Sequence, residues 1–324
     1  MEYTNLRVLV TGAAGFLGSH LCDALLQAGA TVLGVDNFIT GNKENLSDAR
    51  KNQQFTFVEA DAITSPEAYL PSGFLPDAVF HLASPASPPH YQKHPVETYL
   101  VNSMGTHNIL QYLVAHAPSA RFIYASSSET YGNPLEHPQK ESYWGNVNPN
   151  GVRSCYDEGK RFGETICGVH ARNFGMNVRI ARIFNTHGPR MSLGDGRVTI
   201  NFFQQAIKNQ PMTIYGDGKQ TRSFCYVDDL IRGFLLLGSV DRAKGETVNL
   251  GNPNETTVLE LAEAVKKITG ATSEYVFTPM PGDDPVRRKP DITKAKTILG
   301  WEPKISFEEG LKKTIEYYKR FLNT

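Results

Sequence analysis

The sequence predicts an α/β fold, with a doubly wound parallel sheet over residues 1–185 and a smaller C-terminal lobe over residues 186–324. Short apolar runs alternate with helical patterns through the first part, and a glycine-rich turn separates the first run from the first helical pattern. In the second part this alternation loosens, and some of the chain is expected to cross back to the first part.

Composition excludes several classes of function. The 324 residues are 40% hydrophobic and 20% charged, as in a globular protein with a real core. Thirty-three basic residues balance thirty-three acidic ones, so no nucleic-acid partner is expected. The four cysteines are scattered and form no C-x-x-C pair, which argues against a zinc site or a disulfide framework and favours a reducing compartment. No run of eighteen apolar residues occurs, so we expect a cytoplasmic protein that does not enter a membrane.

The N-terminal segment begins with a strand, a glycine turn and a helix. An apolar strand over residues 6–10 leads into Gly12, Gly15 and Gly18. Leucines at helical spacing then continue to Gly29, which is expected to act as the C-cap. Glycines in such a turn let the backbone approach a pyrophosphate that faces the helix N-terminus.

An acidic residue completes this unit. A second strand over residues 31–35 ends in Asp36, at the distance where an acid holds the adenosine ribose of a dinucleotide. Strand, glycine turn, helix and acid together predict a Rossmann-type fold. The cofactor is expected to be NAD, because Asp36 would repel the 2′-phosphate of NADP.

The other strands of the predicted sheet follow in order, at residues 55–59, 78–83, 121–125 and 176–183. A long helix is expected from Pro95 to about Ala115. His81 lies within a strand and is interpreted as a satisfied core histidine rather than a ligand.

Two segments follow directly after predicted strands, at the carboxyl edge of the sheet where open α/β folds bind ligands. Residues 84–89, Ser-Pro-Ala-Ser-Pro-Pro, form either a ligand loop or a proline-stiffened connection. Residues 126–132 contain three serines and Glu129, and form either a substrate site or an ordinary serine-rich turn.

Tyr156 and Lys160 are the candidate proton-transfer pair. A spacing of four on a helix places both side chains on one face, where the ammonium would lower the pKa of the phenol and make it a base. Ser154 with Asp157 resembles a capping box that would begin this helix. The same spacing is common on ordinary amphipathic helices, so the pair alone does not establish catalysis.

The C-terminal part shows short strands near residues 212–215, 223–227 and 247–250. Thr257 with Glu260, and Ser306 with Glu309, resemble the capping boxes of two helices. The charged run over residues 283–291 is interpreted as solvated surface. This part is expected to be a substrate-binding lobe.

Taken together, these features resemble the extended short-chain dehydrogenase/reductase family along essentially the whole chain. The resemblance rests on the glycine turn, Ser127, and Tyr156-x3-Lys160, in that order. It implies that Tyr156 takes the proton from a sugar hydroxyl, that Lys160 lowers the tyrosine pKa and binds the nicotinamide ribose, and that Ser127 hydrogen-bonds the same oxygen. The cofactor-binding residues that it implies are Gly12, Gly15, Phe16, Leu17, Gly18, Asp36, Asn37, Asp61, Leu82, Ala83, Tyr156 and Lys160.

Within this family the chain is similar to the UDP-glucuronate decarboxylases, which make UDP-xylose. The related 4,6-dehydratases typically carry an aspartate as general acid where this chain has Ser128, so the acid that would expel water is missing. Stretches at residues 83–89, 156–161, 181–186 and 288–291 match the decarboxylases. The resemblance implies oxidation of UDP-glucuronate at C4, loss of CO2 and re-reduction at C4.

The resemblance also implies further site residues. Ser128, Glu129 and Arg288 join Tyr156, Lys160 and Ser127 in catalysis, and no metal is expected. The substrate-binding residues are Ser87, Asn185, Tyr215, Arg222 and Arg288. Family members commonly pair through two helices each, so a homodimer is expected through the helices at about 95–115 and 154–172.

Two other functions stay open at this point. A 4-epimerase or a 4,6-dehydratase acting on another nucleotide sugar would use the same Tyr156 and NAD. A non-catalytic regulator that binds NAD would keep the fold without the chemistry, and the intact Ser127, Tyr156 and Lys160 argue against it.

Overall fold

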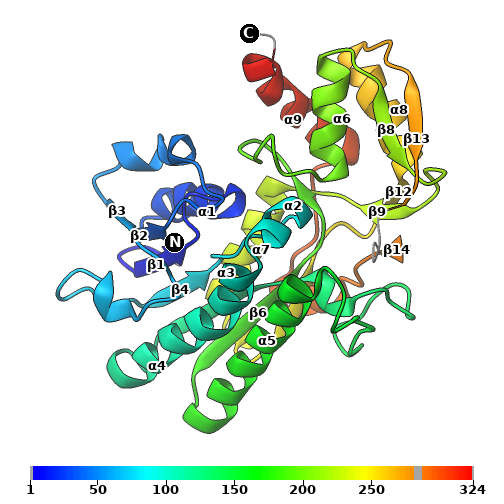
Figure 1. Ribbon diagram of the computed structural model, residues 1–324. Coiled ribbons are helices and arrows are strands. Elements are labelled where there is room, and N and C mark those ends of the chain that lie inside the picture. Colours follow the sequence, from blue (N-terminus) through cyan, green and yellow to red (C-terminus); the bar gives the residue numbers. More distant parts are fainter. Residues whose placement is uncertain (1–2, 281–286, 323–324) are drawn as a thin grey trace.

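A seven-stranded parallel sheet forms the centre of the computed structural model, which describes residues 3–280 and 287–322 (Figure 1). The strand order is β11-β6-β5-β4-β1-β2-β3, which confirms the predicted doubly wound sheet. The strands are β1 (Arg7–Thr11), β2 (Thr31–Asp36), β3 (Phe55–Glu59), β4 (Ala78–His81), β5 (Arg121–Ser127), β6 (Asn177–Ile183) and β11 (Thr247–Leu250).

Both faces of the sheet are buried, because helices cover each of them (Figure 1). In β1, Val8 and Val10 belong to one core and Leu9 to the other, as the two-residue period of a strand requires. Parallel strands that are covered on both sides need apolar residues at successive positions. This is why the sequence shows continuous apolar runs rather than alternation.

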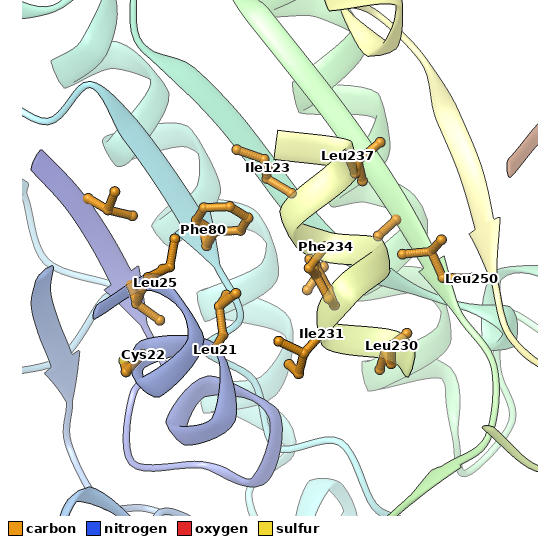
Figure 2. Close-up of a cluster of buried hydrophobic side chains, with 14 of the residues drawn as sticks. Leu21, Cys22, Leu25, Phe80, Ile123, Leu230, Ile231, Phe234, Leu237 and Leu250 are labelled. Carbon is orange, nitrogen blue, oxygen red and sulfur yellow. The ribbon is translucent and has the colours of Figure 1, made fainter. Parts of the chain in front are cut away.

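The first face is covered by α1 (Phe16–Gln27) and α7 (Val227–Ser239). Figure 2 shows Leu21 of α1 and Phe234 of α7 meeting Phe80 of β4 in the core of this face. Helix α7 comes from the C-terminal half of the chain, so the Rossmann-type core is completed by residues far beyond 185.

The second face is covered by α3 (Pro95–Leu100), α4 (Thr106–His116) and α5 (Ser154–Phe174). The single helix expected from Pro95 is interrupted by a π-helical segment, Val101–Gly105. At the start of this segment, His81 Nε2 donates to the Val101 carbonyl at 3.2 Å. His81 Nδ1 meets the Thr11 hydroxyl at 2.7 Å, which confirms a satisfied core histidine.

The C-terminal lobe has its own core, which packs against the carboxyl end of the sheet (Figure 1). Strands β8 and β13 pair in parallel there, and three helices enclose an apolar cluster. These elements are α6 (Val198–Ile207), β8 (Met212–Tyr215), α8 (Val258–Thr269), β13 (Tyr275–Thr278) and α9 (Phe307–Leu322). Short strands join the lobe to the sheet: β7 (Thr186–His187), β9 (Thr221–Ser223), β10 (Cys225–Tyr226), β12 (Glu255–Thr257) and β14 (Arg287–Arg288).

Two strand expectations in this region had different outcomes. The strand expected at residues 247–250 is confirmed as β11, but it belongs to the main sheet, because it pairs with β6 rather than with a strand of the lobe. The strand expected over residues 223–227 is divided between β9 and β10, which pair with different partners. Each difference results from long-range strand pairing, which local sequence patterns do not encode.

The predicted helix caps had mixed outcomes. Thr257 and Glu260 form a reciprocal capping box at α8, and Ser306 accepts a hydrogen bond from the Glu309 amide at the start of α9. The capping box expected at Ser154 is absent, since α5 already includes this residue and has no side-chain cap.

The four cysteines are all free thiols, and three of them are buried. Within the described residues, none of the helices combines the length and the apolarity that a membrane span requires.

Candidate active site

One large cavity, with a volume of about 1040 Å³, lies at the carboxyl end of the sheet and extends to the lobe. Open α/β sheets bind ligands at this edge, where the strand order reverses. The predicted residues that line it are Gly12, Gly15, Phe16, Leu17, Gly18, Leu82, Ser87, Ser127, Ser128, Glu129, Tyr156, Lys160, Asn185, Tyr215, Arg222 and Arg288. The fold therefore brings residues from both halves of the chain to one space.

The glycine turn forms the floor of the cavity. Gly12 has a φ of 73°, and a Cβ atom there would lie 2.7 Å from the Ala83 amide nitrogen. A Cβ atom on Gly18 would lie 2.0 Å from the Gly12 carbonyl oxygen. The first turn of α1 contains no acidic side chain and no side-chain cap. Its N–H groups and its positive dipole end are therefore available to an anion such as a pyrophosphate.

Asp36 braces this turn from the end of β2. Its carboxylate accepts hydrogen bonds from the Ala14 amide at 2.9 Å and from the Phe38 amide at 2.7 Å. Burial nevertheless raises the pKa of the carboxyl group above its usual value. Asp36 lines a second cavity of about 70 Å³, together with Asn37, Asp61, Leu82 and Ala83.

Tyr156 and Lys160 lie one turn apart on α5, and both are buried. Lys160 Nζ donates to the Ala125 carbonyl at 2.7 Å and lies 5.7 Å from the centre of the Tyr156 ring. Burial raises the pKa of Tyr156 to about 12, although a hydrogen bond with Ser127 acts in the opposite direction. Burial also lowers the pKa of Lys160 to about 7. The expected lowering of the tyrosine pKa is therefore wrong for the protein by itself, because desolvation outweighs the effect of nearby charge.

Glu129 lies between two guanidinium groups at the wall of the cavity. Arg288 donates to one of its carboxylate oxygens and Arg153 donates to the other. Burial favours the neutral acid, but the two arginines outweigh it and lower the pKa of Glu129. The neighbouring Asp157 shows the opposite effect, since burial and the charge of Glu129 raise its pKa.

Arg288 is 2% exposed, and it also donates to the Ser128 hydroxyl at 3.2 Å and to the Gly132 carbonyl at 2.8 Å. It thus connects β14 with the turn that follows β5. The interpretation of residues 283–291 as solvated surface was wrong at this position. Residues 283–286 lie outside the described part of the chain.

The predicted sugar-nucleotide residues line the far part of the cavity. Ser87 is buried, and its hydroxyl meets His90 Nδ1 at 3.0 Å. Tyr215 is 40% exposed at the end of β8, and Arg222 on β9 donates to the Thr221 carbonyl. An arginine at this position is suited to a phosphate group.

Three of the cavity-lining residues that sequence reasoning missed make contacts that bear on the site. Arg153 pairs with Glu129, Tyr91 stacks on Tyr156, and Arg197 reaches the Ala86 carbonyl at 3.2 Å. Arg153 lies three positions before Tyr156, which is a local signal that could have been used. The contacts of Tyr91 with Tyr156 and of Arg197 with Ala86 carry no such signal, because the two residues of each contact are far apart in the sequence.

Comparison with known proteins agrees with this geometry. The family described as GDP-mannose 4,6 dehydratase matches residues 9–314. UDP-glucuronic acid decarboxylase 1 of Arabidopsis thaliana is 53% identical over 319 residues, which is 98% of this chain and 71% of that protein. UDP-glucuronic acid decarboxylase 1 of Danio rerio is 48% identical over 321 residues, which is 99% of this chain and 74% of that protein.

Solved structures share the fold. UDP-glucose 4-epimerase of Thermotoga maritima, in complex with UDP-glucose, has a TM-score of 0.88 and 32% identity, and covers 98% of this chain and 100% of its own. UDP-glucuronic acid 4-epimerase of Bacillus cereus, in complex with UDP-glucuronic acid and NAD, has a TM-score of 0.86 and 30% identity, and covers 97% of this chain and 99% of its own. The chain therefore belongs to the GDP-mannose 4,6 dehydratase family of extended short-chain dehydrogenases/reductases, as its motifs indicated, and is related along nearly its whole length to the UDP-glucuronic acid decarboxylases.

Proposed function

We propose that this chain converts UDP-glucuronate to UDP-xylose with bound NAD, through oxidation at C4, loss of CO2 and reduction at C4. One observation carries the proposal: Tyr156, Lys160 and Ser127 face the same cavity as the ion pair of Glu129 with Arg288. The first group suits oxidation of a hydroxyl, and the second suits handling of a carboxylate substrate. The relatives at about half identity, named UDP-glucuronic acid decarboxylases, support this substrate.

The residues present fit NAD. Gly12, Gly15 and Gly18 line the large cavity, and Cβ atoms at Gly12 and Gly18 would collide with neighbouring backbone, so this close-packed turn requires glycine. The first N–H groups of α1 follow the turn without a side-chain cap and are available to a pyrophosphate. Asp36 lies beside the small cavity that would hold the adenosine ribose. When bound here, NAD supplies the acceptor for the C4 hydride and later returns it, so none is consumed.

Proton transfer at the C4 hydroxyl falls to Tyr156. Its hydroxyl keeps its own proton at neutral pH in the protein alone, because burial raises the pKa to about 12. Lys160 can exchange a proton near neutral pH, since its pKa is about 7, and in the charged form it stabilises a phenolate one turn away. Ser127 hydrogen-bonds Tyr156 and orients it toward the sugar.

Oxidation at C4 places the C6 carboxylate β to a ketone. The electrons of the C5–C6 bond then move toward the C4 oxygen as CO2 leaves, and C5 takes up a proton. The Tyr156 and Ser127 hydroxyls stabilise the enolate oxygen. Glu129 is ionised between Arg288 and Arg153, so we assign to it the orientation of these two cations rather than the role of an acid.

A 4-epimerase is the second candidate, because solved 4-epimerases share the fold and would use the same Tyr156 and NAD. Release of CO2 separates the two reactions. The higher identity to the decarboxylases, 53% against 30–32% for the epimerase structures, favours the first proposal. A non-catalytic regulator would not need Ser127 and Lys160 beside Tyr156, so their presence argues against this alternative.

The direct test is incubation of the purified protein with UDP-glucuronate and NAD. We expect CO2 and UDP-xylose in equal amounts, and turnover lower by about 10²–10⁴-fold in Tyr156→Phe, which removes the proton-transfer group. Formation of the C4 epimer without CO2 would identify an epimerase instead. Unchanged turnover in Tyr156→Phe would contradict the assignment of the base.

We also propose that two copies pair through α3 and α5. These adjacent helices expose large apolar side chains, with Val96, Tyr99 and Phe162 at 49%, 44% and 55% exposed. Light scattering should show a dimer that Phe162→Glu converts to a monomer. Phe277→Glu is the matched control, because Phe277 is 56% exposed on β13, away from both helices. A monomeric unmodified protein would contradict the proposal.

A further inference from the structure

We propose that Tyr91 is a positioning residue for the reaction, whose aromatic ring holds the ring of Tyr156 in the orientation that proton transfer requires. This inference rests on the proposed function, since it gives Tyr156 a support that the family motif does not include. Tyr91 lies outside the motif. It contacts Cys155, which directly precedes Tyr156 and lies 64 residues after Tyr91 in the chain.

The contact is a parallel stack of two rings. The ring centres of Tyr91 and Tyr156 are 5.2 Å apart, and their planes differ by 8°. This separation lies within the range that aromatic pairs prefer. Both rings are buried, at 1% and 6% exposed, and both line the large cavity. A ring packed flat against another cannot rotate about its χ1 angle without losing the contact.

Tyr91 itself is held from both sides. It lies on the short helix α2 (Pro88–Lys93), where its amide donates to the Ser87 carbonyl at 3.0 Å. Its own carbonyl accepts from the Cys155 thiol at 3.6 Å, directly before Tyr156 on α5. The proline-rich loop thus docks on the helix that carries the base. This gives the Pro88-Pro89 segment a role beyond stiffening a connection.

The ring, rather than the hydroxyl, carries the role. Among the described residues the Tyr91 hydroxyl has no hydrogen-bond partner, although it is buried. Burial raises its pKa far above the usual value, so this hydroxyl does not titrate in the reaction. Tyr91→Phe preserves the stack, and Tyr91→Leu removes it.

The stack also keeps water from one face of the Tyr156 ring. Desolvation is the main reason that the Tyr156 pKa is about 12 instead of 10. Loss of the Tyr91 ring therefore has two separable results. The Tyr156 pKa falls as water enters, and turnover falls as the phenol loses its fixed orientation.

The test compares Tyr91→Phe and Tyr91→Leu in the full-length protein at matched NAD content. We expect Tyr91→Phe to keep most of the turnover on UDP-glucuronate, and Tyr91→Leu to lose about a hundredfold in kcat, which is the effect of a small misplacement of a reacting group. KM should change little. Tyr69→Leu is the matched control, because Tyr69 is also buried, its hydroxyl has no hydrogen-bond partner within residues 3–280 and 287–322, and it is not among the residues that line the cavity.

A second readout does not depend on the substrate. The phenolate absorbance of Tyr156, obtained as the difference between each variant and the same variant with Tyr156→Phe, should titrate at lower pH in Tyr91→Leu than in Tyr91→Phe. Wild-type protein without CO2 release would contradict the proposed function, and this titration would still decide the role of Tyr91. Three results would overturn the inference. These are the same Tyr156 titration in Tyr91→Phe and Tyr91→Leu, the same loss of kcat in these two variants, and a loss of kcat in Tyr69→Leu as large as that in Tyr91→Leu.

Discussion

Arg288 and Glu129 are 159 residues apart in the chain and form an ion pair in which the Arg288 side chain is 2% exposed and the Glu129 side chain is 16% exposed. Arg153, directly before α5, binds the other oxygen of the same carboxylate, so one acid joins the start of α5, β14 and the turn after β5. An ion pair of this kind stabilises its buried charges only while both side chains are present, because removal of one leaves the other charge without compensation. The relationship also separates this site from a dehydratase site, because Ser128 beside it hydrogen-bonds Arg288 instead of supplying an acid.

Removal of Arg288 should therefore destabilise the protein. We expect Arg288→Met to lower the free energy of unfolding by about 3 kcal/mol, because Glu129 then remains largely buried with only Arg153 as an ion-pair partner. Glu129→Gln combined with Arg288→Met should recover part of this loss, since the unpaired charge is gone. Urea unfolding of both single variants and of the double variant measures the coupling. A double variant as unstable as the sum of the single losses would contradict a coupled pair.

Stability should depend on pH through Lys160. Its pKa is about 7 in the folded protein and 10.5 in the unfolded chain, so between these values the folded state binds fewer protons. The free energy of unfolding of the nucleotide-free protein should then rise with pH, by up to about 1.4 kcal/mol per pH unit, and level off above pH 10.5.

Lys160→Met provides the reference for this measurement, since it removes the titrating group and retains an unbranched side chain. The difference between the two proteins should grow in favour of wild type from about pH 7 upward. Chemical denaturation at several pH values measures it. Parallel stability curves for the two proteins would show that Lys160 titrates normally in the folded state.

The glycine turn should tolerate no side chain. Gly12→Ala would place a Cβ atom 2.7 Å from the Ala83 nitrogen at a φ of 73°, so we expect loss of bound NAD as well as of stability. Gly73→Ala is the matched control, because Gly73 has a φ of 78° and nothing within 4 Å of the added atom. NAD content after purification should fall only in Gly12→Ala. Equal NAD content in the two variants would contradict a role of the turn in cofactor binding.

Ser128→Asp should not create a dehydratase. The C6 atom of UDP-glucuronate carries a carboxylate and no hydroxyl leaving group, so an acid at this position has no oxygen to expel. The new carboxylate would instead compete with Glu129 for Arg288, and we expect slower CO2 release. Product analysis by mass spectrometry checks this, and a product lighter than the substrate by one water would show the prediction wrong.

Local chemistry determined the features that the sequence alone could predict. Gly12, Gly15 and Gly18 followed by Asp36 specify a strand, turn and helix within one short segment, and the four-residue spacing of Tyr156 and Lys160 places them on one helical face. Hydrogen-bond periodicity and backbone sterics act over a few residues, so these elements and the family could be inferred without coordinates.

Only the tertiary structure decided how the site is assembled and charged. The stack of Tyr91 on Tyr156, the pairing of Arg288 with Glu129, and the π segment beside His81 depend on chain segments brought together from far apart. Burial then reversed one expectation, because desolvation of the Tyr156 phenol raises its pKa more than nearby positive charge lowers it. Desolvation is a property of the packed interior, and residue spacing carries no measure of it.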